Sequence, residues 1–291
     1  MDPTRPGTLA IPLFVLLIAA EMLWLWRVRR QAYPWREAGT SLGLALGYKA
    51  AGLLTPLVIG PVYLAVWELR PWTLPLDSMG SLLGLFLGVE FAYYWFHRCA
   101  HECRWLWATH AVHHSPTQLN LSAAYRLGWT ALLSGNWLFF LPLVALGFHP
   151  LAVTAAIGLN LVYQFWLHTE AIGRLPRVVE WIFNTPAHHR VHHACNGVYL
   201  DRNYGGVLIV FDRLFGTFAA ERAGEPLRYG LVRPVTSANP LRVAVHEWVA
   251  MARDVAQARS MAEAFRLMFG RPGAATPAKP AATDLPLVAK A

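Results

Sequence analysis

Long apolar runs alternate with short polar segments along this chain. Residues 9–26 form a first apolar run in which Glu21 is the only charged residue, and residues 41–67 and 81–96 form two more. A helix that crosses a bilayer needs about 20 apolar residues. Each run is therefore predicted to be a membrane helix, and the polar segments between the runs are predicted to lie outside the bilayer.

Two further apolar runs, 131–147 and 151–167, are separated by only three residues. Each is at the short end of the spanning range, so a complete hairpin across the bilayer and a shallow re-entrant pair are both open. Either arrangement returns the chain to the side from which it started. Segments 97–126 and 168–193 are therefore predicted to meet on one face of the membrane.

Composition strengthens the membrane interpretation. Hydrophobic residues make up 55% of the chain and charged residues 14%, against about 25% charged in soluble domains. We therefore expect an all-α integral membrane protein with four or five transmembrane helices. The net charge is +8, but Arg27, Arg29 and Arg30 directly follow an apolar run, where positive charge marks the cytoplasmic side. The basic balance thus indicates topology, and nucleic acid is not an expected partner.

Candidate chemistry is concentrated in histidine clusters, an H-x3-H followed by two H-x2-HH: His97 and His101; His110, His113 and His114; His189, His192 and His193. On a helix, positions i, i+3 and i+4 share one face, so each cluster is predicted to point its imidazoles at a single spot. Eight imidazoles exceed the needs of one four-coordinate site. They predict two metal ions side by side, and imidazole suits iron, copper, nickel or zinc.

Further candidates lie near these clusters. His168 ends an apolar run on the predicted histidine-bearing face, so we expect it to be a ligand. His188 adjoins His189 and is expected either to be an additional ligand or to donate a hydrogen bond from outside the site. Carboxylates that could ligate metal or orient an imidazole are Glu90, Glu102 and Glu170.

The clusters and the segments after them resemble a known superfamily. The matching segments are HRCAH at 97–101, HAVHH at 110–114, HHRVHH at 188–193, NYGG at 203–206 and FDRLFGTF at 211–218. Together they resemble the fatty acid hydroxylase superfamily, the membrane di-iron enzymes that include sterol desaturases and lipid hydroxylases. Within it, the segments at 163–170, 184–193 and 201–218 are most similar to alkylglycerol monooxygenase and its bacterial relatives.

The resemblance implies a metal site, cofactors and partners. It implies these ligands: His97, His101, His110, His113, His114, His168, His189, His192 and His193, with His188 as an uncertain addition. It also implies two iron ions, O2 as co-substrate, and hydroxylation or desaturation of an unactivated C–H bond in a membrane lipid. Electrons would come from an external donor protein or from tetrahydrobiopterin. The site would lie on the cytoplasmic face of a bacterial inner membrane or of the endoplasmic reticulum.

Four regions follow from the pattern and the resemblance. Residues 1–80 are predicted to form N-terminal transmembrane helices, and 81–218 a catalytic domain of membrane helices with a cytoplasmic helical cap. Residues 219–270 are predicted to be a cytoplasmic amphipathic region, with 240–269 as one surface helix. Residues 271–291, rich in Ala, Pro and Lys, are predicted to be disordered.

Two other functions compete with this interpretation. A sterol-type desaturase or methyl oxidase of the same superfamily would differ only in its product. A metal transporter or bis-histidine haem carrier belongs to another class, but transporter ligands lie near the bilayer midplane within broken helices. Here the histidines lie beyond the ends of the apolar runs and in tight clusters, which favours the oxygenase.

Overall fold

A computed structural model describes residues 5–273 of the chain. In this part the regular elements are all helices, apart from two isolated β-bridges that pair Phe183 with Leu208 and Ala194 with Tyr229. The predicted all-helical class is therefore confirmed. The predicted disordered tail falls almost wholly outside the described residues.

Residues 5–110 contain five α-helices and one π-helical turn: α1 Arg5–Trp24, η1 Leu25–Arg29, α2 Trp35–Gly52, α3 Thr55–Glu68, α4 Met79–Glu102 and α5 Arg104–His110. A run of short elements follows: η2 Leu121–Tyr125, α6 Ala131–Ser134, η3 Asn136–Phe140 and α7 Leu141–Ala145. The remaining helices are α8 Pro150–Phe165, α9 Arg177–Ile182, α10 Pro186–His193, α11 Val210–Leu214, α12 Pro240–Ala256 and α13 Met261–Phe269.

Among the described residues, α4 is the helix that is long and apolar enough to cross a membrane by itself. Its start is fixed by a capping box, in which the side chains of Ser78 and Ser81 each bond the other residue's backbone N–H. Helices α2 and α3 pass the same test only as a pair, and they are bent by 50° at their junction. One or two candidate spans are thus present, and the predicted number of four or five stays a prediction.

The apolar segment 131–147 is broken into α6, η3 and α7, because Gly135 adopts a left-handed conformation and Pro142 restarts the helix. Helix α8 is 16 residues long. Each of these four elements is shorter than the about 20 residues that a span needs. This geometry favours the re-entrant alternative over a complete hairpin.

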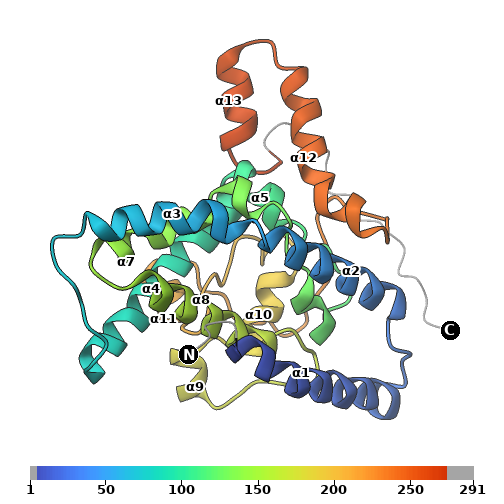
Figure 1. Cartoon of the computed structure of the whole chain (residues 1–291). Helices are drawn as coiled ribbons and strands as arrows, with labels where there is room; N and C mark the ends of the chain where they lie inside the picture. Colours follow the sequence, from blue (N-terminus) through green and yellow to red (C-terminus); the bar gives the residue numbers. More distant parts are fainter. Residues whose placement is uncertain (1–4, 274–291) are drawn as a thin grey trace.

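The histidine-bearing helix α10 lies near the centre of the molecule, between α1 on one side and α2 and α3 on the other (Figure 1). The turn η2 packs against both α1 and α2. Its first N–H, at Leu121, donates to the Glu21 carboxylate of α1 at 2.8 Å. Helix α4 packs with α3, α7 and α8 in a hydrophobic core that includes Tyr63, Val89 and Val144.

The segment 240–269 forms two helices rather than the one predicted. α12 and α13 make a hairpin that projects from the rest of the chain (Figure 1). The helix stops at Gln257 and restarts where the Ser260 side chain accepts the Glu263 N–H. The buried Arg104 of α5 holds α12 through ion pairs of 2.8 Å to Glu247 and 2.7 Å to Asp254.

Candidate metal centre

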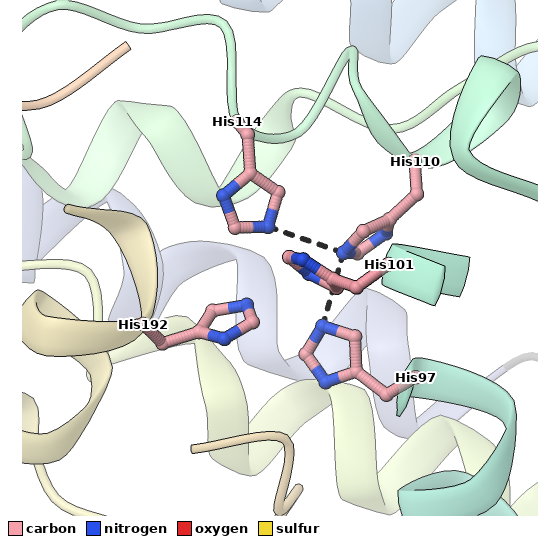
Figure 2. A group of neighbouring side chains, drawn as sticks. All are labelled: His97, His101, His110, His114 and His192. Carbon is pink, nitrogen blue, oxygen red and sulfur yellow. Dashed lines mark hydrogen bonds between the residues drawn. The ribbon is translucent and has the colours of Figure 1, made fainter. Parts of the chain in front are cut away.

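The histidines predicted as ligands lie in two adjacent groups. The first holds five imidazoles (Figure 2): His97, His101, His110, His114 and His192. The second holds four: His113, His168, His189 and His193. Within each group, one ring nitrogen from every residue lies within 4.8 Å of the others. The groups adjoin through His114 and His193, whose ring centroids are 4.5 Å apart.

Each H-x2-HH cluster divides between the two groups, which corrects the expectation that it points at a single spot. The i and i+4 histidines stay together, whereas the i+3 histidine, His113 or His192, belongs to the other group. A turn of 3.6 residues separates positions i+3 and i+4 by about 100° around a helix axis. In addition, α5 ends at His110, so His113 lies in a turn. One short segment therefore supplies both sites.

Four imidazoles lie with Nδ1 against a backbone carbonyl: His97 against Tyr204 at 2.8 Å, His113 against Arg126 at 3.3 Å, His168 against Gln164 at 2.9 Å and His192 against Arg202 at 2.9 Å. A carbonyl can only accept, so each Nδ1 carries the proton and each Nε2 keeps its lone pair. This is how metal-binding histidines are usually oriented.

The lone pairs provide a direct test of whether these residues fit a metal. The Nε2 atoms of His113 and His168 are 3.2 Å apart, and by the assignment above both carry lone pairs, which repel. A cation bound by both resolves the conflict, since two ligand nitrogens at about 2.1 Å and a right angle lie about 3.0 Å apart. Nε2 of His101 and of His192 are also buried without a hydrogen-bond partner among the described residues. The residues fit metal.

The charge state of the imidazoles supports the same conclusion. Burial first, and repulsion by neighbouring imidazoles second, lower the pKa of His110, His113 and His114 well below the usual value. Burial also lowers the pKa of His168 to about 4, against hydrogen bonds that raise it. At neutral pH these side chains are uncharged, which is the form that binds metal ions.

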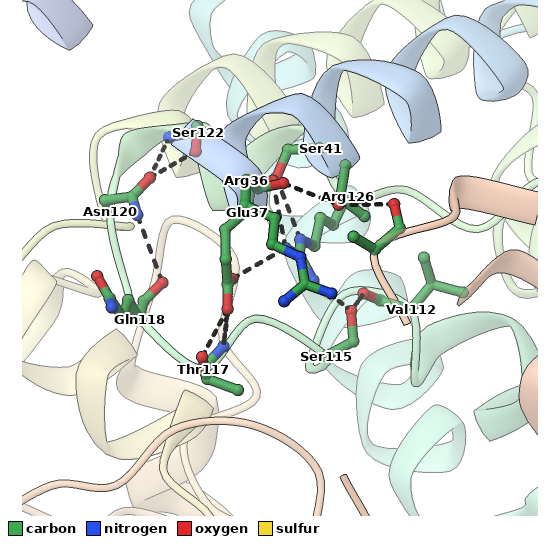
Figure 3. Close-up of polar contacts among 12 residues, drawn as sticks. Arg36, Glu37, Ser41, Val112, Ser115, Thr117, Gln118, Asn120, Ser122 and Arg126 are labelled. Atoms are coloured by element: carbon green, nitrogen blue, oxygen red, sulfur yellow. Dashed lines mark hydrogen bonds and ion pairs between the residues drawn. The ribbon is translucent and has the colours of Figure 1, made fainter. Parts of the chain in front are cut away.

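A buried arginine anchors the turn that carries His113. Figure 3 shows Arg126, whose guanidinium donates to Ser41 at 3.1 Å, to Ser115 at 2.9 Å and to Glu37 at 2.9 Å. Glu37 also accepts the Thr117 N–H. Because the Arg126 carbonyl faces His113, this network ties the orientation of one imidazole to helix α2.

The NYGG segment orients His97 from the opposite side. Its Tyr204 carbonyl faces His97, while the Tyr204 and Gly205 N–H groups each donate to the Asp212 carboxylate at 2.7 Å. A side chain at Gly205 would overlap the backbone of Leu208. Asp212 is fully buried and also accepts the Thr217 hydroxyl at 2.6 Å. Gly205 and Asp212 thus hold the Tyr204 carbonyl in position to accept the Nδ1 proton of His97.

A third polar network leads from Glu90 to His168. The Glu90 carboxylate accepts from Asn160 at 2.5 Å and from the Val207 and Leu208 N–H groups at 2.8 and 2.9 Å. Asn160 accepts from the Gln164 amide, whose backbone carbonyl faces His168. Glu90 therefore ties α4, α8 and the two residues after the NYGG segment together, and it lies in neither histidine group.

These histidines and the segments around them match a known family. Residues 82–217 match the family described as fatty acid hydroxylase. Over this segment the chain is similar to the fatty acid hydroxylase family. The predicted resemblance is therefore confirmed, and the matched segment includes every histidine of both groups.

Several proteins that are similar to this chain have names that refer to lipids. The chain is 42% identical over 186 residues to alkylglycerol monooxygenase of Homo sapiens, which is 64% of this chain and 41% of that protein. It is 50% identical over 148 residues to the Danio rerio protein, 51% and 32% of the two chains. It is 36% identical over 130 residues to ornithine lipid hydroxylase of Rhizobium tropici, 45% and 39% of the two chains. No solved structure gives a significant match.

Several predicted candidates in the matched segment lie outside the two groups. His188 is buried but belongs to neither group. Glu102 pairs with Arg98 at 3.2 Å, and Glu170 accepts the Tyr229 hydroxyl at 3.1 Å. Among the described residues, the metal groups contain imidazoles alone.

Three charged residues that support the segments carrying the histidines were missed by the sequence interpretation: Glu21, Arg126 and Asp212. A sequence signal existed for Glu21, because an ionisable residue inside an apolar run usually has a function. It accepts the hydroxyl of Thr169, the residue after His168. Arg126 and Asp212 carry no such signal, since each acts through a neighbouring backbone group.

Proposed function

We propose that this chain is a membrane-bound oxygenase that uses O2 and external electrons to oxidise an unactivated C–H bond of a lipid. One observation carries the proposal. Two adjacent groups of neutral imidazoles, some with Nε2 lone pairs that face each other, lie within the segment that matches the fatty acid hydroxylase family. Such facing lone pairs are stable only around cations, and imidazole is a good ligand for iron.

In this proposal the five-histidine group would hold one iron ion and the four-histidine group the other. When bound, the ions would supply the activation of O2 and the abstraction of hydrogen from the lipid. The protein keeps the imidazoles uncharged by burial and fixes their rotation through backbone carbonyls. It also excludes water from the site, since His97, His189 and His193 are at most 3% exposed.

An apolar cavity beside His168 suits an alkyl chain. It has a volume of about 210 Å³ and is lined by α1 residues, including Leu17 and Trp24, and by Leu121, Trp166 and Thr169. Thr169 adjoins His168, so a chain in this cavity would lie close to the four-histidine group. The buried Glu21 carboxylate bonds Thr169 at the same place. We propose that this cavity admits the lipid tail.

The relatives suggest the lipid class. The human and Danio rerio proteins named alkylglycerol monooxygenase match over more of this chain, and at higher identity, than the protein named ornithine lipid hydroxylase. We therefore propose an alkylglycerol as the first substrate to test and hydroxylation as the first reaction. The chain spans about two-fifths of the human relative's length. The substrate in that relative's name is therefore a hypothesis to be tested on this chain.

We also propose that the site lies on the cytoplasmic face and receives electrons from a separate donor, either a protein or a pterin. The arginines at 27, 29 and 30 support this topology, because positive charge is retained on that side. No sequence motif for haem, flavin or nucleotide binding supplies an internal source of electrons.

The decisive experiment combines metal analysis with product analysis. Protein purified under anaerobic conditions should contain about two irons per chain, one for each histidine group. Cells that express it, fed an alkylglycerol or an ornithine lipid, should convert one of them to a product heavier by one oxygen atom. Loss of two hydrogens instead would indicate a desaturase. No bound iron together with an unchanged lipid profile would contradict the proposal.

A further inference from the structure

A second pocket lies on the side of α10 that does not face the metal groups. It occupies about 220 Å³ between α9 and α11, and α10 contributes Ala187 and His188 to its wall. The other residues relevant here are Arg174, Arg177, Trp181, Arg213 and Phe218. No part of the proposed oxygenase chemistry uses this pocket.

The charge of the pocket is positive once its ion pairs are considered. Of its two acidic residues, Glu221 binds Arg190 through contacts of 3.0 and 3.3 Å and lies 4.0 Å from the Arg174 guanidinium. Glu180 accepts the Leu175 N–H at 2.9 Å. Arginine side chains from α9, α11 and the preceding loop therefore outnumber the carboxylates that could neutralise them. An anion is the ligand that this surplus would attract.

The wall of the pocket carries a buried polar atom without a partner. His188 is only 3% exposed, and its Nδ1 has no hydrogen-bond partner among the described residues. Its ring lies edge-on to Phe218, with centroids 5.3 Å apart. Buried polar atoms are nearly always hydrogen-bonded, so an unpartnered ring nitrogen of a histidine that lines a pocket indicates a ligand that it would contact.

The helices that border the pocket expose apolar side chains, and one of them packs on the candidate span. Val178 and Trp181 of α9 and Leu214 of α11 are 74%, 61% and 72% exposed. Helix α11 packs on α4, where Phe91 lies 5.7 Å from Phe211, centroid to centroid. The exposed apolar surface of α4 therefore leads to α9 and α11. Arginine, tryptophan and apolar side chains in this combination are typical of a membrane interface.

We infer that this pocket binds the phosphate group of an anionic phospholipid. The guanidinium groups of Arg174, Arg177 and Arg213 would surround the phosphate, and His188 would hydrogen-bond the headgroup. Arg213 is already held in place by the backbone carbonyls of Glu180 and Trp181 and by the ring of Phe218, 3.7 Å from its guanidinium carbon. The acyl chains would lie along the exposed apolar side chains of α9 and α11. The inference does not depend on the proposed oxidation chemistry.

The test is lipid retention by the purified full-length chain in a non-ionic detergent, followed by native mass spectrometry. The probes are dioctanoyl phosphatidylglycerol, dioctanoyl phosphatidylcholine and inorganic phosphate. We expect preferential binding of phosphatidylglycerol, and Arg177→Glu should weaken it about tenfold. The matched control is Arg242→Glu, an equal charge reversal on an exposed residue of α12, outside the pocket.

The outcomes separate the candidate ligands. Equal weakening by both charge reversals, or equal binding of the two lipids, would overturn the inference. Binding of inorganic phosphate that phosphatidylglycerol does not displace would assign the pocket to a soluble phosphate instead. His188→Ala should also weaken phosphatidylglycerol binding while the iron content is retained. Loss of iron in that variant would make His188 a metal ligand and would overturn its role here.

Discussion

The orientation of single imidazoles depends on atoms that belong to other segments of the chain. Backbone carbonyls fix the tautomers of His97, His113, His168 and His192. The first three of these carbonyls are supported in turn by the networks of Asp212, Arg126 and Glu90. A ligand with a fixed tautomer loses little entropy when metal binds. Removal of a ligand and removal of its support should therefore have different effects.

Removal of a ligand tests the metal assignment directly. His113→Ala should lower iron content and abolish lipid oxidation while membrane insertion persists, because the second group keeps only three imidazoles. Iron is measured by mass spectrometry and insertion by membrane fractionation. The control is His246→Ala, which changes a histidine of α12 that lies in neither group. Full activity in His113→Ala would exclude it as a ligand.

Removal of a side chain that positions a carbonyl should lower the stability of the fold more than it lowers the rate of lipid oxidation. In Asp212→Asn, the amide NH2 would face a backbone N–H that the carboxylate now accepts. The cost of one unsatisfied buried group is about 1–3 kcal/mol, and the Tyr204 carbonyl that orients His97 would shift. We expect a lower midpoint of denaturant unfolding in detergent and faster loss of iron to a chelator. An unchanged midpoint would mean that Asp212 is not needed to hold the segment.

Sequence spacing was sufficient to find the histidines but insufficient to divide them. Residue identity shows which side chains can bind metal, so the histidines that form the two groups were all predicted as ligands. Their division into two groups depends on helix phase and on the turn at His113. The carbonyl partners have no sequence signature at all, because every residue carries a backbone carbonyl.

At the scale of helices and segments, the close approach of the NYGG segment to its neighbours is the most restrictive feature. Gly205→Ala should destabilise the chain by about 1–3 kcal/mol, as expected for overpacking, because the new Cβ would overlap the Leu208 carbonyl. The measurement is denaturant unfolding in detergent. Gly197→Ala is the matched control, since nothing lies within 4 Å of a Cβ there. Equal stability of the two variants would contradict this account.

Helix ends explain where the segment predictions differed from the structure. The periodicity of 240–269 predicts one helix, and the structure has two, Pro240–Ala256 and Met261–Phe269. The break depends on the Ser260 cap, and a serine is also compatible with an unbroken helix, so the sequence does not reveal it. The apolar run 131–147 likewise has the composition of a span, yet Gly135 and Pro142 divide it. Composition determines which segments avoid water, whereas caps and breaks determine their lengths.

At the scale of the whole molecule, metal should contribute strongly to stability. The chain without metal keeps buried imidazoles whose lone pairs face each other, so chelation of iron should lower the melting temperature by about 10 °C. Fe²⁺ should restore it and Mg²⁺ should not, because Mg²⁺ prefers oxygen ligands. Differential scanning fluorimetry in detergent provides the measurement. A melting temperature that is independent of iron would contradict the assignment.

The predicted topology can be tested with cysteine labelling. In a variant whose three cysteines are replaced by alanine, Asp77→Cys and Arg259→Cys should react with a membrane-impermeant maleimide from opposite sides of intact vesicles. Asp77 lies just before the first residue of α4. Arg259 lies in the turn between α12 and α13, and this pair of helices packs against α5, which follows the other end of α4. Labelling of both from the same side would exclude α4 as a span.

Helix α10 contributes His192 to one group and His189 and His193 to the other, and the segment 110–114 is shared in the same way. An ion in either group would therefore order two segments that the other group also requires. Loading should be cooperative, so that titration with Fe²⁺ gives a Hill coefficient above one and few chains that carry a single ion. Chains in a cell short of iron would then be either fully loaded or empty, and total activity would fall as the number of loaded chains falls.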